Sequence, residues 1–451
     1  MKKIIIAIAL LASIQIAGAQ PQQVKSVNAA KSAVEAATKA TTNAKKAANP
    51  ATWIKLGQSL LDAYAAPQGN GWVGASEQEL NLVMGQAKVL GTRQETIQGQ
   101  PYMVKSYENS DYYFNPNGQL AVIKVTAPVV EDCLGQALDA YAKAGAVDAA
   151  GKKTKDIVAG IKTVNGKYNE EAYNAYTLGD LESASALFEK AAAALATAPC
   201  SQIDTNAIYN AGLTSWFVAN GKSDAVQTGA WLERSRKFYE QALSYNYFGE
   251  DGEVYAKLGD IADKLGDKEL CRDWLEKGFT AFPASQSILV GLINFYVASG
   301  DNPKRIFELL DLAKKNEPGN ASLYYVEGNI HDKLHEEEAA MASYDKCAEI
   351  NPDYEYGYIG KGVLLYNKAI DLQEKANNEM DDAKYMALVA QFEGALKGCI
   401  EPFEKAFEIT KDEGIKVSIA EYLKNACFRF RTDETYKAKY DKYNQIVADS
   451  K

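Results

Sequence analysis

Small and apolar positions recur along the chain with a period near 34 residues. Three apolar segments end in proline, at 275–283, 310–318 and 344–352, and their prolines lie 35 and 34 residues apart. Small residues recur at related positions of the three units: Gly278, Ala313 and Cys347 inside these segments, and Gly259, Gly291 and Gly328 upstream of them. The pattern predicts two helices per unit, with small residues where helices cross and a proline that ends the second helix.

Four stretches carry this pattern most clearly, and one of them reads YYVEGNIHDKLHEEEAAMASYDKCAEINP. They are residues 176–195, 208–217, 255–267 and 324–352. Their large residues, glycines, alanines and closing prolines stand at the offsets of the tetratricopeptide repeat (TPR), and the chain resembles that family over 165–353. The resemblance implies a mainly α fold, a TPR-type α-solenoid of stacked antiparallel helix pairs. It also implies that the first helix of each pair lines the concave surface.

The repeat continues with interruptions on both sides. Residues 356–369 predict a first helix whose partner returns near Phe403, with longer helices through 371–397 between them. Residues 52–64 predict another first helix, whose partner lies near Tyr141. We expect the helices of about 414–448 to cap the array.

Residues 66–130 depart from the helical pattern. Ser76 and Glu79 have the spacing of a capping box before a short apolar helix. The β-rich stretches are PYMVKSY at 101–107, DYYF at 111–114 and QLAVIKV at 119–125, with a hairpin turn at 115–118. We therefore expect a small β-hairpin-containing insertion near the N-terminus, outside the helix stack.

The beginning of the chain resembles a signal peptide. Lys2 and Lys3 precede an apolar run at 4–16, and Ala17-Gly18-Ala19 supplies small residues for cleavage. The run is shorter than the roughly 20 residues that a spanning helix needs. We expect an exported, periplasmic bacterial protein with no membrane span, whose mature chain starts near Gln20.

The next segment is rich in Lys and Ala. Between residues 20 and 60 there are six lysines and one acid, Glu35. One interpretation is a solvated helix or flexible leader, and the other is a basic arm that contacts anionic envelope material. The predicted organisation is a signal peptide (1–19), this leader (20–49), a first TPR-like pair with its insertion (50–150), a core TPR array (151–353) and an extended repeat with capping helices (354–451).

Charge and composition narrow the function classes. The formal net charge is −10, which argues against a nucleic-acid partner. The only two histidines, His331 and His335, have metal-ligand spacing on a helix, but no third histidine exists, so packing or a turn is the favoured role. Phosphate-loop and nucleophile-elbow motifs are absent from the sequence. We expect no enzyme activity, no cofactor and no metal.

Three of the six cysteines replace small apolar residues of the repeat. Cys271 and Cys399 stand where other repeats have alanine, and so does Cys347. We expect buried thiols at these three positions, because a free cysteine packs as a small apolar residue. Disulfide bonds stay open for Cys133, Cys200 and Cys427.

When the repeat is mapped onto the chain, it places a set of aromatic and polar side chains in the concave groove. The candidate partner-binding residues are Tyr209, Trp216, Phe217, Phe295, Tyr296, Tyr325, Asn329, Tyr356 and Tyr366. Two functions remain. The first is a non-catalytic scaffold of the cell envelope that holds another envelope protein or an extended peptide, with membrane association only through that partner. The second is a ligand-capturing accessory protein that binds a peptide or glycan through the β insertion. The competing view of the groove residues is that they pack between helices.

Overall fold

The computed structural model describes residues 24–85, 87–300 and 302–449. The predicted signal peptide lies outside these residues. The chain forms two compact units, residues 1–249 and 250–451, here called the first and the second unit. The division falls inside the range 151–353 that the sequence assigned to one core array.

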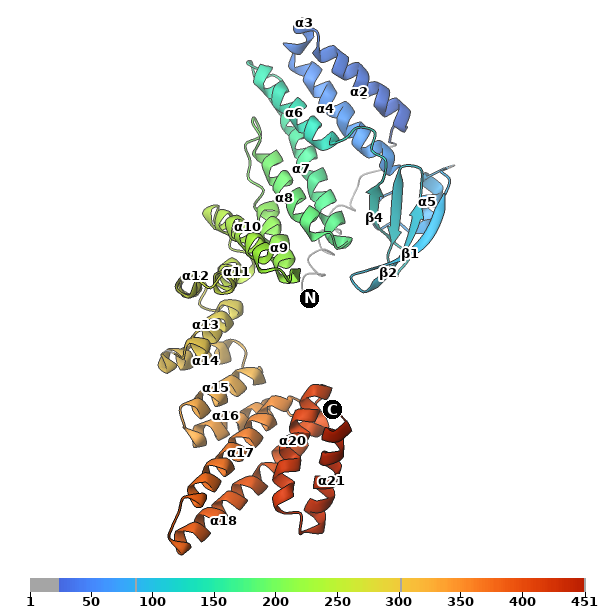
Figure 1. The fold of residues 1–451 in the computed structure, drawn as a ribbon. Helices are drawn as coiled ribbons and strands as arrows, with labels where there is room; N and C mark the ends of the chain where they lie inside the picture. The colour runs from blue at the N-terminus through green and yellow to red at the C-terminus, as the bar shows by residue number, and fades with distance from the viewer. Residues whose placement is uncertain (1–23, 86, 301, 450–451) are drawn as a thin grey trace. The chain divides into compact units, whose positions relative to one another are not determined.

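The first unit combines helix pairs with a small sheet (Figure 1). Its helices are α2 (Val27–Thr41), α3 (Ala44–Ala47), α4 (Pro50–Ala65), the 3-10 turn η1 (Ala66–Gln68), α5 (Glu77–Val83), α6 (Cys133–Val147), α7 (Thr154–Thr177), α8 (Leu181–Ala196), α9 (Thr205–Gly221) and α10 (Ala225–Ser244). Helix α4 pairs with α6, α7 with α8, and α9 with α10, while α2 packs on α4. One apolar core runs from Ala30 of α2 to Ala242 of α10.

The second unit consists of helices. They are η2 (Glu250–Gly252), α11 (Glu253–Lys264), α12 (Lys268–Ala281), α13 (Gln286–Ser299), α14 (Pro303–Asn316), α15 (Ala321–Lys333), α16 (Glu337–Ile350), α17 (Glu355–Asn377), α18 (Asp382–Gly398), α19 (Ile400–Ile409), α20 (Glu413–Arg429) and α21 (Glu434–Asp449). Side-chain oxygens of Asp267, Asn302 and Asp412 accept backbone N–H bonds at the starts of α12, α14 and α20. The predicted mainly α solenoid with a β element near the N-terminus is confirmed.

Large side chains of the second helices lie against glycines of the first helices. Tyr344 of α16 faces Gly328 of α15 and Gly360 of α17, so one ring contacts its own repeat and the next. Leu275 of α12 likewise faces Gly259 and Gly291. Tyr141 of α6 repeats the arrangement with Gly57 and Gly160. Because glycine has no Cβ, the helices approach closely at these crossings, as the sequence pattern predicts.

The sheet has the order β1-β2-β3-β4 and is antiparallel throughout. Its strands are β1 (Gly91–Ile97), β2 (Gln100–Ser106), β3 (Ser110–Phe114) and β4 (Leu120–Val125). Three strands and the Ser76–Glu79 capping box were predicted and are confirmed. The edge strand β1 was missed, because GTRQETI is polar and mostly exposed.

The two faces of the sheet pack against different elements. Tyr112, Phe114 and Ile123 cluster with Leu80 of α5 on one face. On the other face Val104 clusters with Leu178, the residue that follows α7. The Gln98 side chain also donates to the Tyr176 carbonyl at 2.9 Å. The insertion therefore contacts the helix stack, whereas the sequence placed it outside, because the pattern of the strands does not reveal which helix covers them.

All six cysteines are free thiols and buried, including the three whose state the sequence left open. Burial raises the pKa of Cys399 to about 12 and those of Cys271 and Cys347 to about 11. Since the thiolate is the reactive form, both burial and the raised pKa slow reaction with thiol reagents.

We expect the native protein to react slowly with DTNB at about pH 8, because the thiolate fraction is small and shielded. After denaturation without a reductant, six thiols per chain should react. Fast labelling of the native protein, or fewer than six thiols after denaturation, would contradict the buried free-thiol assignment.

Candidate protein-interaction site

The first helix of each pair in the second unit presents the candidate surface. We call the outward side chains of α13, α15 and α17 the first-helix face. Helix α13 packs beside α11, and α15 packs beside α17. No charged residue occurs anywhere in α13, from Gln286 to Ser299. This part of the face is therefore suited to apolar contacts.

Phe295 and Tyr296 stand next to each other on α13, and both are half-buried. Their rings meet edge to face, with centroids 5.3 Å apart. The Tyr296 hydroxyl donates to Glu276 at 2.9 Å, and Glu276 pairs with Arg305 at 3.0 Å. Burial, followed by the bond to Glu276, raises the pKa of Tyr296. Tyr296 is thus held by the helices behind it, and Phe295 presents its half-buried ring beside it.

Tyr325 and Tyr356 form a ring cluster between α15 and α17. Their centroids lie 5.4 Å apart, and Tyr354 lies 5.3 Å from Tyr356. Tyr344 approaches Tyr325 to 6.1 Å and donates its hydroxyl proton to Asn329 at 2.8 Å. The Asn329 side chain therefore has a packing role, and the tyrosines join neighbouring repeats.

Tyr366 lies near the end of the face, on α17. It packs edge-on against Tyr422 of α20, at 5.0 Å, and Tyr422 stacks on Phe403 at 4.9 Å. Burial raises the pKa of Tyr366, whose hydroxyl is also hydrogen-bonded to Asn425. This tyrosine closes the packing between α17 and α20.

The remaining three predicted residues belong to α9 in the first unit. Phe217 contacts Trp216 at 5.4 Å and Tyr176 at 6.5 Å. Tyr209 lies between Tyr239 and Tyr247, at 5.7 Å and 5.5 Å. All three are half-buried. The sequence assigned all nine candidate residues to one groove, but these three lie in the first unit and the other six in the second.

Several polar contacts near these helices were not predicted. Lys314 of α14 pairs with Glu327 of α15 at 2.6 Å, and in the first unit Tyr64 donates to Glu171 at 2.6 Å. Burial raises the pKa of the Glu171 carboxyl. Each pair joins different helices, and charged or polar residues are common enough in the sequence that spacing alone singles out none of them.

The two histidines have structural roles. His331 stacks on Phe307, with centroids 4.6 Å apart, and its Nδ1 lies 2.6 Å from Glu336. His335 occupies a left-handed position, at φ 60°, in the turn between α15 and α16. Within the described ranges no group of three or more His, Cys, Asp or Glu is arranged to hold a metal ion.

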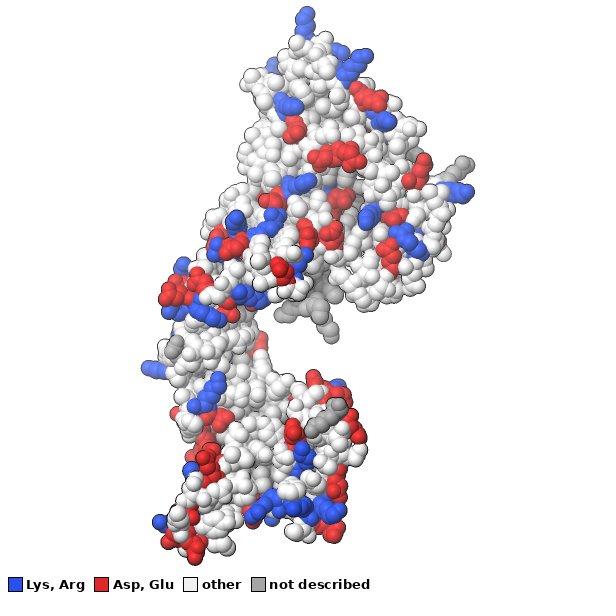
Figure 2. All heavy atoms as spheres, viewed as in Figure 1, with Lys and Arg blue, Asp and Glu red and all other residues white. Residues whose placement is uncertain are grey.

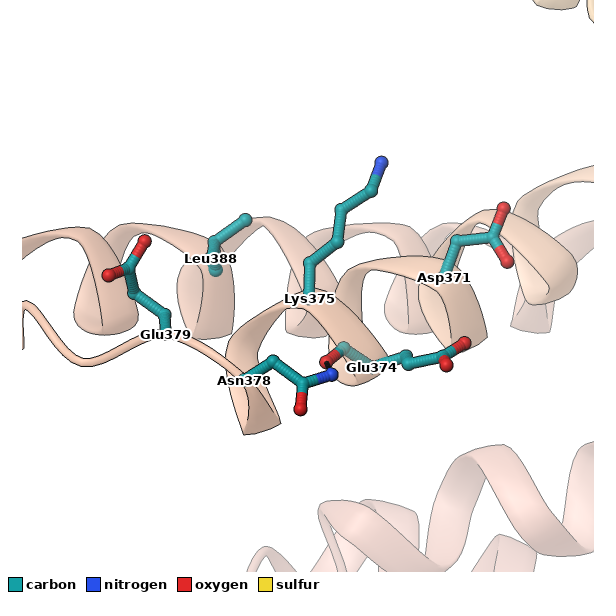
Figure 3. Close-up of a pocket in the computed structure, with 6 residues that line it drawn as sticks. All are labelled: Asp371, Glu374, Lys375, Asn378, Glu379 and Leu388. Atoms are coloured by element: carbon teal, nitrogen blue, oxygen red, sulfur yellow. Dashed lines mark hydrogen bonds between the residues drawn. The ribbon is translucent and has the colours of Figure 1, made fainter.

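Each unit carries an open hollow. Figure 2 shows acidic side chains at the tip of the α17–α18 hairpin, where a hollow of about 600 Å³ lies between the two helices. Figure 3 shows its lining, with Leu388 contributed by α18 and the other residues by α17 and the turn after it. The second hollow, of about 410 Å³, lies on α8 and α10 beside Arg234 and Phe238. Among the described helices, none combines the length and the apolar character needed to cross a bilayer.

Comparison with known proteins identifies the repeats. Residues 252–285, which span α11 and α12, and residues 321–354, which span α15 and α16, match the family model of the tetratricopeptide repeat. These two segments of the chain are therefore TPR repeats. No curated protein matches its sequence significantly.

Solved TPR structures resemble parts of the chain at low identity. YrrB, described as a TPR protein with an unusual peptide-binding site, is 18% identical and matches 46% of this chain and 93% of its own, with a TM-score of 0.33. The thermophilic TPR protein TTC0263 of Thermus thermophilus is 17% identical and matches 47% of this chain and 98% of its own, with a TM-score of 0.31. A TPR repeats protein of Bacteroides fragilis is 14% identical and matches 63% of this chain and 99% of its own, with a TM-score of 0.26.

Proposed function

We propose that this protein is a non-catalytic scaffold that holds a polypeptide partner, an envelope protein or an extended peptide, on the first-helix face. The observation that carries the proposal is α13, which has no charge along its length and presents Phe295 at the surface of the stack. Aromatic side chains are favoured anchors because they bury a large area while few torsions are frozen.

The packing contacts divide the candidate residues into two groups. Asn329 accepts a hydrogen bond from Tyr344, Tyr296 donates one to Glu276, and the Tyr366 ring packs against Tyr422. These contacts hold the three side chains in the helix stack, where they form the surface around the anchor. Phe295 is the side chain on which we place the anchor. The proposal therefore assigns binding to fewer residues than the sequence nominated.

Replacing Phe295 by alanine should weaken partner binding at least about tenfold, because truncating a central anchor commonly costs about 2 kcal/mol. Tyr245→Ala is the matched control, since Tyr245 is an exposed aromatic residue at the end of α10 in the first unit, outside this face. Affinity for the partner recovered by crosslinking, together with the melting temperature, is the readout. Equal binding by both variants would refute the assignment of Phe295.

Export to the periplasm is part of the proposal. It rests on Lys2, Lys3, the apolar run at 4–16 and the Ala17-Gly18-Ala19 segment. N-terminal sequencing of the protein from its native host should find a start near Gln20 in the periplasmic fraction. A retained Met1, or fractionation with cytoplasmic markers, would overturn this part.

Ligand capture by the β insertion is the second candidate function. Exposed apolar side chains on and beside the sheet favour it: Trp72, Val73, Leu82, Val89, Leu90 and Met103. Such side chains suit the apolar surfaces of a peptide or a sugar ring. A direct titration with peptidoglycan fragments and peptides, monitored by Trp72 fluorescence against a Trp72→Phe control, tests this function separately.

A further inference from the structure

The hairpin of α17 and α18 carries an apolar surface that no described residue covers. Met380, in the turn, is 96% exposed, and Met386 of α18 is 64% exposed. Tyr385 and Ile370 are 43% and 44% exposed. Exposed large apolar side chains on one hairpin favour an interaction site, and methionine adapts its shape to a partner. We call this surface the hairpin tip.

Negative charge surrounds the hairpin tip. The hollow of about 600 Å³ is bordered by Asp371, Glu374 and Glu379, against a single lysine, Lys375 (Figure 3). Asp381 and Asp382 follow in the turn and at the start of α18. A partner for this surface must therefore combine small or apolar contacts with positive charge.

The N-terminal segment of the same chain has that chemistry. Alanine is the most frequent residue of α2 and α3, and Lys31, Lys39, Lys45 and Lys46 are exposed. These four lysines form no ion pair with any residue of the described ranges. The exposed alanines give the segment a smooth surface that flexible methionines can cover.

Charge is also distributed unequally between the two units. Residues 250–451 contain 26 Lys and Arg against 38 Asp and Glu, and residues 1–249 contain 23 against 21. The lysine-rich segment lies in the first unit and the acidic hairpin tip in the second. Both occur once in every chain, so each copy carries one surface of each kind.

We propose that the hairpin tip of one copy binds the α2–α3 segment of a second copy. The two surfaces differ, so the contact is heterologous, and it builds rings or open chains of copies. The methionines and alanines supply the apolar contact, and the acids and lysines fix the pairing. Because the charges lie at the surface, salt weakens the association.

Charge reversal on each surface tests the proposal with the full-length mature chain. One variant, the segment variant, carries Lys31→Glu, Lys39→Glu and Lys45→Glu. The other, the tip variant, carries Asp371→Lys, Glu374→Lys and Asp382→Lys, which spares the Asp381 side chain that caps α18. Sedimentation velocity over a concentration series, at about 50 and 500 mM salt, measures association, and circular dichroism verifies the fold.

The wild type should associate at low salt and at least about tenfold more weakly at high salt, and each variant alone should stay monomeric. In an equimolar mixture, the lysine-rich segment of the tip variant can bind the unchanged acidic tip of the segment variant. Association should therefore return when the two variants are mixed. Met380→Asp, at an exposed position, should weaken wild-type association as well.

Three results would overturn the proposal. The first is a wild type that stays monomeric at every concentration. A monomer in which the hairpin tip binds the α2–α3 segment of its own chain counts as this result. The second is association that the reversals leave unchanged. The third is a variant mixture that stays monomeric although both variants are folded.

Discussion

Replacing Tyr344 by alanine should lower the free energy of unfolding of the second unit by about 3–5 kcal/mol, the usual range for a buried aromatic residue. Tyr344 is 2% exposed and fills the space between α15 and α17, against Gly328 and Gly360. Its loss leaves a cavity between two repeats and removes the hydrogen bond to Asn329. Denaturant unfolding followed by far-UV circular dichroism measures the change.

Tyr385→Ala is the control for this substitution. Tyr385 lies on α18 and is exposed, so its truncation should change stability by less than about 0.5 kcal/mol. Equal shifts for the two tyrosines would show that Tyr344 does not hold the repeats together.

Gly360→Ala should destabilise the second unit by about 1–3 kcal/mol, the cost of overpacking a close crossing. A Cβ at this position would lie 2.4 Å from Cε1 and 2.6 Å from Cδ1 of Tyr344. The buried ring has little room to move, because Gly328 of α15 lies against it as well.

Gly394→Ala should change stability in the opposite direction. Gly394 lies inside α18, and no atom outside its own helix turn lies within 4 Å of the added Cβ. Alanine should therefore raise helix stability by about 0.5–1 kcal/mol. Thermal unfolding of both variants tests the contrast, and destabilisation by both would contradict the role given to Gly360.

The repeat architecture was predictable because it depends on side-chain size at fixed spacing. Gly259, Gly291 and Gly328 recur in the sequence, and each faces a large side chain of a second helix. The polar strand β1 carried no comparable signal. Residues 371–397 were expected to hold longer helices, and they form the end of α17 and most of α18, but the exposed hairpin tip could not be foreseen from helix length alone.

The candidate site was predictable only as a set of positions. The repeat pattern places Tyr296, Asn329 and Tyr366 on first helices, where the structure has them. Their hydrogen bonds and ring contacts are made with Glu276, Tyr344 and Tyr422, which belong to other helices. Spacing along one helix cannot show such partners.

Photocrosslinking from the first-helix face tests the scaffold function most directly. A photoreactive phenylalanine replaces Phe295 in one protein and the exposed Leu82 of α5 in another, and both are irradiated in the native host. We expect one defined polypeptide to be crosslinked from position 295, and crosslinking to fall when excess unlabelled protein competes, but not when its Phe295→Ala variant does. No competed polypeptide at position 295, with specific crosslinks from position 82 alone, would contradict the scaffold and favour ligand capture by the β insertion.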